Sequence, residues 1–225
     1  FALGRDLQQA ITGKSGAGLR LQVGVADVLP KLIAQQILLP VYQLKDPVRL
    51  ICREDRQERL LADLALHELD VVLTDAPLGQ TVKVRAFNHL LGESPVALFG
   101  SSTLAKRLRK QFPQSVTDAP LLLPTDNTML RRSVEQWLSD HDLRPHIVGE
   151  FEDSALMKSF GSAGIGVFAA PLLMAKAILA QYDCELIGQL DGVVERFYAI
   201  SVERRIKHPA VAAICQSARE SLFSS

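Results

Sequence analysis

Apolar residues in the segment 19–40 change their spacing once, from the period of a strand to that of a helix. Residues 19–25 alternate apolar and other side chains, as in a β-strand. After Ala26 and Asp27, apolar residues recur every three or four positions, as on one face of an α-helix. In open α/β sheets, the carboxyl ends of strands beside helix N-termini form small-molecule sites. We therefore expect ligand binding at this turn.

The same spacing predicts alternating strands and helices along the rest of the chain. Strands are expected at residues 48–52, 70–74, 82–90, 95–100, 121–123, 147–151, 167–170, 185–190 and 197–202. Helices are expected at residues 29–40, 56–69, 104–112, 128–141, 154–160, 171–182 and 209–223. Two α/β sets followed by a late strand and helix indicate two lobes joined by two strands, with a cleft between the lobes.

The N-terminal segment differs from the rest of the chain. Residues 1–12 have helical spacing, and residues 13–18 are rich in glycine. This pattern is typical of the end of a longer helix followed by a flexible joint. Because the first residue is Phe1 rather than Met, we expect further chain upstream. No signal peptide is visible, and no apolar run approaches the ~20 residues of a membrane span, so a cytoplasmic protein is expected.

Charge and cysteine content exclude several classes of protein. Among the 225 residues, 25 basic and 25 acidic side chains give a formal charge of zero. A domain that binds nucleic acid usually carries an excess of basic side chains, so this part of the chain is not expected to contact DNA. The chain has three cysteines, Cys52, Cys184 and Cys215. Their number is odd, and no two of them have CxxC spacing. They therefore predict reduced thiols rather than a disulfide framework or a zinc site, and no cofactor is expected.

Two glycine-rich segments resemble nucleotide-binding motifs but lack the required context. Residues 12–15 (TGKS) precede a strand, whereas a phosphate-binding loop follows one, and Gln8 occupies the position of its first glycine. Residues 161–166 read GxxGxG before a strand, rather than GxGxxG after one. The five histidines form no metal-binding pair, and no nucleophile, base and orienting group can be assembled from local spacing. The pattern therefore does not favour an enzyme.

Four longer segments resemble a known family. They are LRLQVGVADVLPKLIAQQILLPVY, LLADLALHELDVVLTDAP, LLLPTDNTMLRRSVEQWL and GSAGIGVFAAPLL, and their order and spacing cover nearly all of residues 19–223. Together they resemble the effector-binding domain of LysR-type transcriptional regulators. Within that family, the chain is most similar to regulators that activate sodium/proton antiporter expression.

The resemblance implies a fold and an organisation. The fold would be two Rossmann-like α/β lobes joined by two crossover strands, like type 2 periplasmic binding proteins. Residues 1–18 would be the end of a linker helix and its joint, residues 19–97 plus 194–225 lobe I, and residues 98–193 lobe II. A DNA-binding helix-turn-helix domain would lie upstream. Subunits would form a homodimer or tetramer, for which helices 29–40 and 209–223 are the expected contacts.

The resemblance also implies an effector site between the lobes, built from loop positions. Carried onto this sequence, these positions are Ala26, Asp27, Thr74, Asp75, Ser101, Ser102, Thr125, Asp126, Asn127, Thr128 and Phe168. Many family members bind carboxylate-bearing metabolites, yet no arginine occurs among these positions. The effector of this chain is therefore expected to differ in charge.

Three of these positions are carboxylates: Asp27, Asp75 and Asp126. If they converge, they favour a hard cation such as Na⁺ over an anion. The alternative is structural, because Asp27 and Asp126 can cap helices and Asp75 can begin a turn. Control of an antiporter would also couple Na⁺ to H⁺, for which His67 and His89 are the candidate pH sensors.

Two other functions remain open at the level of the sequence. A stand-alone periplasmic-type solute-binding protein would need a signal peptide and no linker helix. A small α/β enzyme would need a catalytic cluster in the cleft, and changing Asp27 or Asp126 would then abolish turnover.

Overall fold

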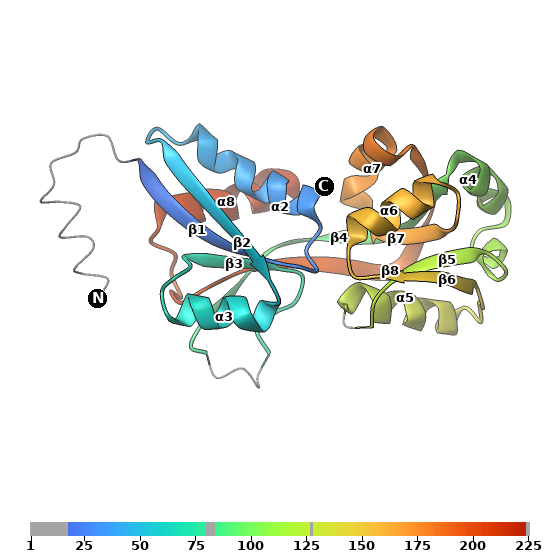
Figure 1. Ribbon diagram of the computed structural model, residues 1–225, viewed down its shortest axis with the longest axis horizontal. Helices are drawn as coiled ribbons and strands as arrows, with labels where there is room; N and C mark the ends of the chain where they lie inside the picture. The colour runs from blue at the N-terminus through green and yellow to red at the C-terminus, as the bar shows by residue number, and fades with distance from the viewer. Residues whose placement is uncertain (1–17, 80–83, 127, 224–225) are drawn as a thin grey trace, which may run out of the picture.

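Two lobes share one mixed sheet in the computed structural model of the chain (Figure 1). The structure describes residues 18–79, 84–126 and 128–223, so the predicted helix end at residues 1–12 lies outside it. The strands are β1 (Leu19–Ala26), β2 (Val48–Asp55), β3 (Val71–Thr74), β4 (Phe87–Ser101), β5 (Pro120–Pro124), β6 (His146–Phe151), β7 (Val167–Pro171) and β8 (Cys184–Ser201). The α-helices are α2 (Lys31–Leu38), α3 (Gln57–Ala65), α4 (Ser102–Leu108), α5 (Met129–Asp140), α6 (Ser154–Ser162), α7 (Ala175–Tyr182) and α8 (Pro209–Ser217).

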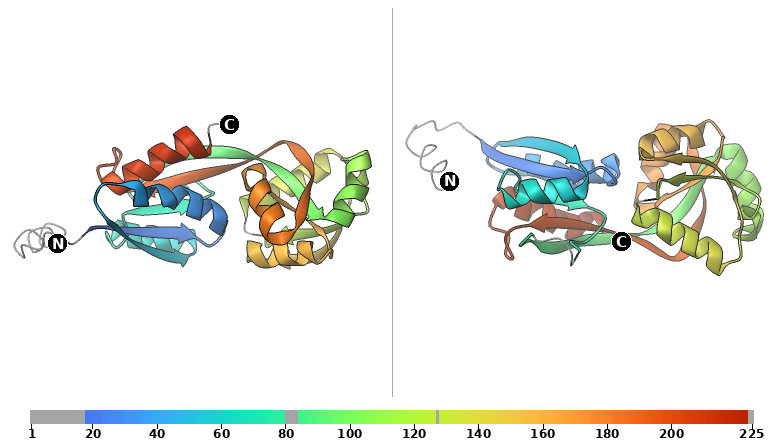
Figure 2. Two further views of the ribbon diagram at one scale, coloured as in Figure 1. Left: turned by 90° about the horizontal axis from the view of Figure 1, so that it is seen from above. Right: turned by 60° about the horizontal axis from the view of Figure 1, so that its bottom comes forward.

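The sheet has the strand order β2-β1-β3-β8-β4-β7-β5-β6. In one lobe, β1 lies parallel to both β2 and β3, as in a β-α-β unit. In the other lobe, β5 lies parallel to both β6 and β7. The strands β4 and β8 are antiparallel to each other and pass from one lobe to the other, which Figure 2 shows from two further directions. The two lobes and their two connecting strands are as the sequence predicted.

The two long strands correct the sequence analysis. Residues 95–100 and the described end of the segment 82–90 belong to the single strand β4, and the segments 185–190 and 197–202 belong to the single strand β8. The residues left between these expected strands include Gly92 and Gly192. The strands accommodate them through register shifts of their pairing, which are β-bulges, and through a positive φ of 79° at Gly192. The predicted lobe boundaries fall inside β4 and β8, and their exact residues stay a prediction.

Helices cover both faces of the sheet in each lobe (Figures 1 and 2). Apolar residues of α2 and α8, such as Ile33 and Ile214, pack with β1 and β3 in a cluster that extends into the second lobe. A second cluster lies under α4 and α5, where Trp137 is only 4% exposed. A third cluster joins α3 to the other face of β1 and β3. No described helix is long and apolar enough to cross a membrane.

The helices α5 and α6 each begin at a side-chain cap. The hydroxyl of Thr128 accepts a hydrogen bond from the backbone N–H of Arg131, at 3.1 Å. The carboxylate of Asp153 accepts one from the N–H of Leu156, at 2.6 Å. Each bond satisfies one of the free donors at a helix N-terminus. These caps fix where two helices of the second lobe begin, beside the space between the lobes.

Candidate functional site

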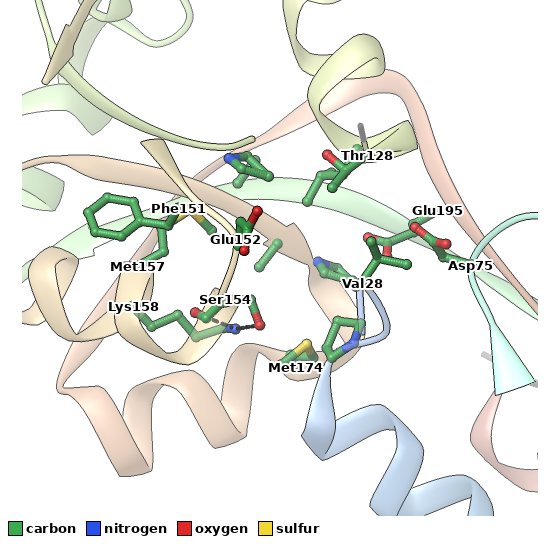
Figure 3. Close-up of a pocket in the computed structure, with 16 residues that line it drawn as sticks. Val28, Asp75, Thr128, Phe151, Glu152, Ser154, Met157, Lys158, Met174 and Glu195 are labelled. Atoms are coloured by element: carbon green, nitrogen blue, oxygen red, sulfur yellow. Dashed lines mark hydrogen bonds between the residues drawn. The ribbon is translucent and has the colours of Figure 1, made fainter. Parts of the chain in front are cut away.

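A cleft between the lobes receives side chains from both of them (Figure 3). Val28 and Asp75 come from the first lobe, and Thr128 and Lys158 from the second. Glu195 comes from the connecting strand β8, where it pairs with Ser94 of β4. The cavity volume of the cleft is about 40 Å³. By this measure a water molecule needs roughly 10–15 Å³, so the cleft has room for a small ion or a few waters.

Glu195 is the most deeply buried carboxyl group of the cleft. It is 5% exposed, and its Oε2 atom has no hydrogen-bond partner within the described part of the chain. Burial and, to a smaller extent, the nearby charge of Asp75 raise the pKa of Glu195 to about 8, against the opposing effect of the Lys158 ammonium. A buried carboxyl oxygen without a partner is costly, so this atom marks a position where a ligand would be stabilised.

Asp75 lies beside Glu195, just after the end of β3 (Figure 3). It is 7% exposed, and burial raises its pKa to about 6. The charge of Asp27 contributes to this rise. Hydrogen bonds from the backbone N–H of Asp75 and from Thr74 act against it. Two buried carboxyl groups that repel each other hold protons more tightly than free ones do. The pair therefore favours a proton or a bound cation at neutral pH.

Lys158 supplies the positive charge of the cleft. Its Nζ atom donates hydrogen bonds to the backbone oxygen of Ser154, at 3.0 Å, and to the Ser154 hydroxyl, at 3.1 Å. Burial lowers the pKa of Lys158 to about 8, while the charges of Glu195 and Asp153 oppose this. The three charged groups thus come from the first lobe, a connecting strand and the second lobe. A change in the angle between the lobes would change the distances between them.

Of the predicted site residues that the structure describes, only Asp75 and Thr128 line this cleft. Thr74 is buried, and its hydroxyl donates to the Oε1 atom of Gln57, at 2.7 Å. Phe168 stacks on Phe99 within the core, with 6.1 Å between the ring centres. Both side chains are thus buried and do not line the cleft in this structure.

The other predicted positions that the structure describes do not line the cleft either. Ala26 is fully buried in the third apolar cluster. Ser101 ends β4, and the adjacent Ser102 hydrogen-bonds to Glu185. The N–H of Thr125 donates to the backbone oxygen of Phe151, whereas Asn127 lies outside the described residues.

The three predicted carboxylates do not form a metal site in the described part of the chain. The Asp27 carboxylate accepts a hydrogen bond from the N–H of Val28, at 2.9 Å, and does not cap α2. Asp126 pairs with Arg131, at 3.3 Å, and is 83% exposed. Within residues 18–79, 84–126 and 128–223, no group of three or more His, Cys, Asp or Glu side chains could hold a metal ion. Asp75 instead has Glu195 as its buried acidic neighbour.

The candidate pH sensors also lie outside the cleft. His67 follows α3 with a positive φ of 58° and does not line the cleft. The Nε2 atom of His89 is 3.0 Å from the Ser201 hydroxyl and 3.2 Å from the backbone oxygen of Glu203. Burial lowers the pKa of His89, and these contacts hold the ring in the first lobe. The groups with strongly shifted pKa values in the cleft are Asp75, Lys158 and Glu195.

Glu195 and Lys158 were missed by the sequence analysis. Glu195 lies between Val193 and Phe197 at every second position of β8, and all three side chains are buried on the same face of the strand. Lys158 follows the buried Met157 in α6. A charged residue at an inward-facing position of an apolar pattern is the signal that could have identified both.

Comparisons with known proteins agree with this architecture. The family model of the LysR substrate binding domain matches residues 14–222. The transcriptional activator protein NhaR of Escherichia coli (strain K12) is 34% identical over 224 residues, which cover all of this chain and 73% of that protein. The NhaR of Shigella flexneri matches to the same extent. These relatives are transcriptional regulators rather than enzymes or solute carriers.

Solved structures share the fold at low sequence identity. A full-length OxyR variant from Pseudomonas aeruginosa has a TM-score of 0.71 and 17% identity, over 97% of this chain and 75% of that one. The effector-binding domain of QuiR in complex with shikimate has a TM-score of 0.66 and 14% identity, over 90% and 96%. The two-lobed fold of LysR effector-binding domains, like that of type 2 periplasmic binding proteins, is therefore confirmed. This chain belongs to the LysR family of transcriptional regulators and contains the family's effector-binding domain.

Proposed function

We propose that this chain is the sensing domain of a transcriptional activator in the cytoplasm that controls Na⁺/H⁺ antiporter expression in response to Na⁺. DNA would be bound by a helix-turn-helix domain outside the described residues. The similarity to NhaR supports the regulatory role. The observation that carries the choice of a cation is the buried Asp75–Glu195 pair, with an unpartnered Glu195 oxygen facing an ion-sized cavity.

The chemistry of the cleft supports a hard cation. Na⁺ prefers oxygen ligands, and the two carboxyl groups offer them together with nearby backbone carbonyls. An anion placed beside Asp75 and Glu195 would meet like charge in a buried setting. Ion binding would replace the proton that the pair holds and so offset its desolvation.

A second candidate effector is a small carboxylate, favoured by one specific observation. The buried ammonium of Lys158 lies at the first turn of α6, so the positive end of that helix faces the same cleft. The Asp75–Glu195 pair opposes this ligand unless both carboxyl groups remain protonated. The two effectors thus make opposite demands on the protonation of the pair.

Signal transmission would follow from the placement of the charges. Because Asp75, Glu195 and Lys158 belong to three different parts of the fold, an ion between them changes the preferred angle between the lobes. A ligand that binds one arrangement more tightly shifts the population toward it. The reoriented lobes would then alter the spacing of the DNA-binding domains in an oligomer.

Proton sensing would arise at the same pair rather than at His67 or His89. Because the pKa of Glu195 is about 8, raising the pH through this value ionises its carboxyl group. The ionised form attracts Na⁺ more strongly than the protonated form does. We therefore expect Na⁺ affinity to rise with pH between about 7 and 9.

Oligomer formation is the remaining part of the proposal. The strand β6, at one edge of the sheet, exposes Ile147 (51%) and Val148 (47%). The neighbouring helix α6 exposes Leu156 and Phe160. By contrast, the buried apolar residues of α8 pack on the first lobe. We infer that β6 and α6 contact the region of α2 in a second copy, whereas helix 209–223 is the weaker candidate.

The test is isothermal titration of the chain with NaCl against KCl, at constant ionic strength maintained with choline chloride. We expect saturable binding of Na⁺ that weakens at least about 10-fold in Glu195→Gln and in Asp75→Asn, the loss typical of removing one charged ligand. Asp126→Asn is the matched control, because Asp126 is exposed and outside the cleft.

Three outcomes would contradict the proposal in different ways. Equal responses to Na⁺ and K⁺ would remove Na⁺ as the effector. Loss of binding in Asp126→Asn but not in Glu195→Gln would move the site out of the cleft. Binding of a small carboxylate that is lost in Lys158→Met would favour the second candidate effector.

A further inference from the structure

A second cavity lies in the first lobe, between α8 and the loop that follows β8. Its volume is about 360 Å³, which is within the range of small-molecule sites. None of its lining residues contributes to the interlobe cleft. The loop lies at the end of this lobe that is remote from the second lobe (Figure 2). The proposed response to Na⁺ makes no use of this cavity.

Arginines dominate the charge of this second cavity. Arg204, Arg205 and Arg219 line it together with a single acidic residue, Glu220. The Glu220 carboxylate accepts hydrogen bonds from the side-chain amide of Gln216, at 3.1 and 3.3 Å. Within the described residues, Arg204 and Arg205 have no hydrogen-bond or ion-pair partner. The cavity therefore presents an excess of positive charge that the lobe itself does not neutralise.

Arg219 is anchored to the backbone of β4 by one hydrogen bond. Its Nε atom donates a hydrogen bond to the backbone oxygen of Leu90, at 2.9 Å. Its two terminal nitrogens have no partner in the described part of the chain. The positive charge of Arg219 acts on two other residues that line the cavity. Together with burial it lowers the pKa of His89, and it opposes the rise that burial causes in the pKa of Cys215. A guanidinium fixed at Nε can still donate two bonds to a ligand.

Part of the wall of this cavity is apolar. Ala212 and Cys215 come from α8, and Ile206 comes from the loop. Cys215 is 3% exposed and belongs to the main apolar cluster, so the core of the lobe forms part of this wall. A ligand for this cavity would therefore combine an anionic group with a small apolar body.

We propose that this cavity is a second effector site, which binds a small organic anion carrying a phosphate or carboxylate group. Planar guanidinium groups match the geometry of both oxyanions through paired hydrogen bonds. Arg219 would position the anion, and Arg204 and Arg205 would close over it from the loop. His208 of the same loop lies 3.2 Å from the backbone oxygen of Arg20 in β1. Occupation of the cavity would thus fix the loop against the first residues of β1.

Titration calorimetry of the chain with inorganic phosphate, pyrophosphate and citrate tests this proposal, with chloride keeping the ionic strength constant. We expect at least one probe to bind saturably in the millimolar range or below. The double variant Arg204→Ala, Arg205→Ala should weaken that binding at least about 10-fold, because it removes charge-assisted hydrogen bonds. Arg144→Ala is the matched control, since Arg144 is 85% exposed in the other lobe.

Further variants separate this site from the cleft and from loss of folding. Glu195→Gln should bind the anion as the parent chain does, because Glu195 lies in the cleft. The double variant Arg204→Lys, Arg205→Lys keeps the charge and should retain part of the affinity. The proposal would be overturned if no probe bound saturably, or if the Ala double variant bound as tightly as Arg144→Ala. Binding of duplex DNA through these arginines, with no small-anion binding, would also overturn it.

Discussion

Replacing Glu195 by Gln should stabilise the fold at alkaline pH and remove a defined part of its pH dependence. Burial raises the pKa of Glu195 from 4.5 to about 8. Between these values the folded chain holds a proton that the unfolded chain releases. Stability contributed by this group is therefore fully present below about pH 4.5 and is lost as the pH rises toward 8.

The size of the effect follows from this difference in pKa. Stability falls by about 1.4 kcal/mol for each pH unit over which only the unfolded form is ionised. The pKa of Asp75 is about 6, so Asp75 contributes to the slope mainly at lower pH. Between about pH 6 and 8, Glu195→Gln should then remove roughly 3 kcal/mol of pH-dependent destabilisation. The attraction of Lys158 is already included in the shifted pKa and does not change this sign.

Urea denaturation at several pH values between about 6 and 8 measures this effect. Glu195→Gln should already be the more stable of the two at the acidic end of this range, and the difference in free energy of unfolding should widen steadily toward the alkaline end. Glu152→Gln is the matched control, because Glu152 borders the same cleft but is exposed. Parallel pH profiles for the parent and Glu195→Gln would refute the argument that this carboxyl group is buried in its protonated form.

Other substitutions test the core, the oligomer and the cleft. Phe168→Ala should cost about 3–5 kcal/mol in urea denaturation, because the ring is buried against Phe99; a loss below about 1 kcal/mol would show that this stack is not part of the core. Ile147→Glu should convert the oligomer to monomers in light scattering, whereas the control Leu66→Glu should not; an unchanged mass would exclude the β6 edge as a contact. Thr128→Ala should cost about 1 kcal/mol through loss of the α5 cap, and an unaltered melting temperature would contradict that role.

The sequence predicted the elements whose local signals agree with their tertiary setting. The segment 70–74, apolar at residues 71–73, contains the buried strand β3, and Thr128 and Asp153 cap the helices that they precede. Such positions depend on periodicity and on capping, which act within a few residues. The two-lobed order followed from the same signals.

The remaining errors have a common physical origin. The expected strands stopped short of Gly92 and Gly192, but the pairing between β4 and β8 continues on both sides of these glycines through register shifts. The predicted carboxylates Asp27, Asp75 and Asp126 form no metal-binding group among the described residues, and Asp126 pairs with Arg131 instead, which no local pattern reveals. Glu195 and Lys158 were missed because burial gives them their properties, and burial depends on segments far away in the sequence.

The position of β8 in the sheet has a consequence for how the chain folds as it is synthesised. This strand is the last to leave the ribosome, yet it lies between β3 and β4, which emerge much earlier. Until it arrives, those two strands present unpaired edges, which are prone to wrong pairing. The lobe that begins the domain is thus completed last, and a chain that ends before β8 would lack the central strand of that lobe.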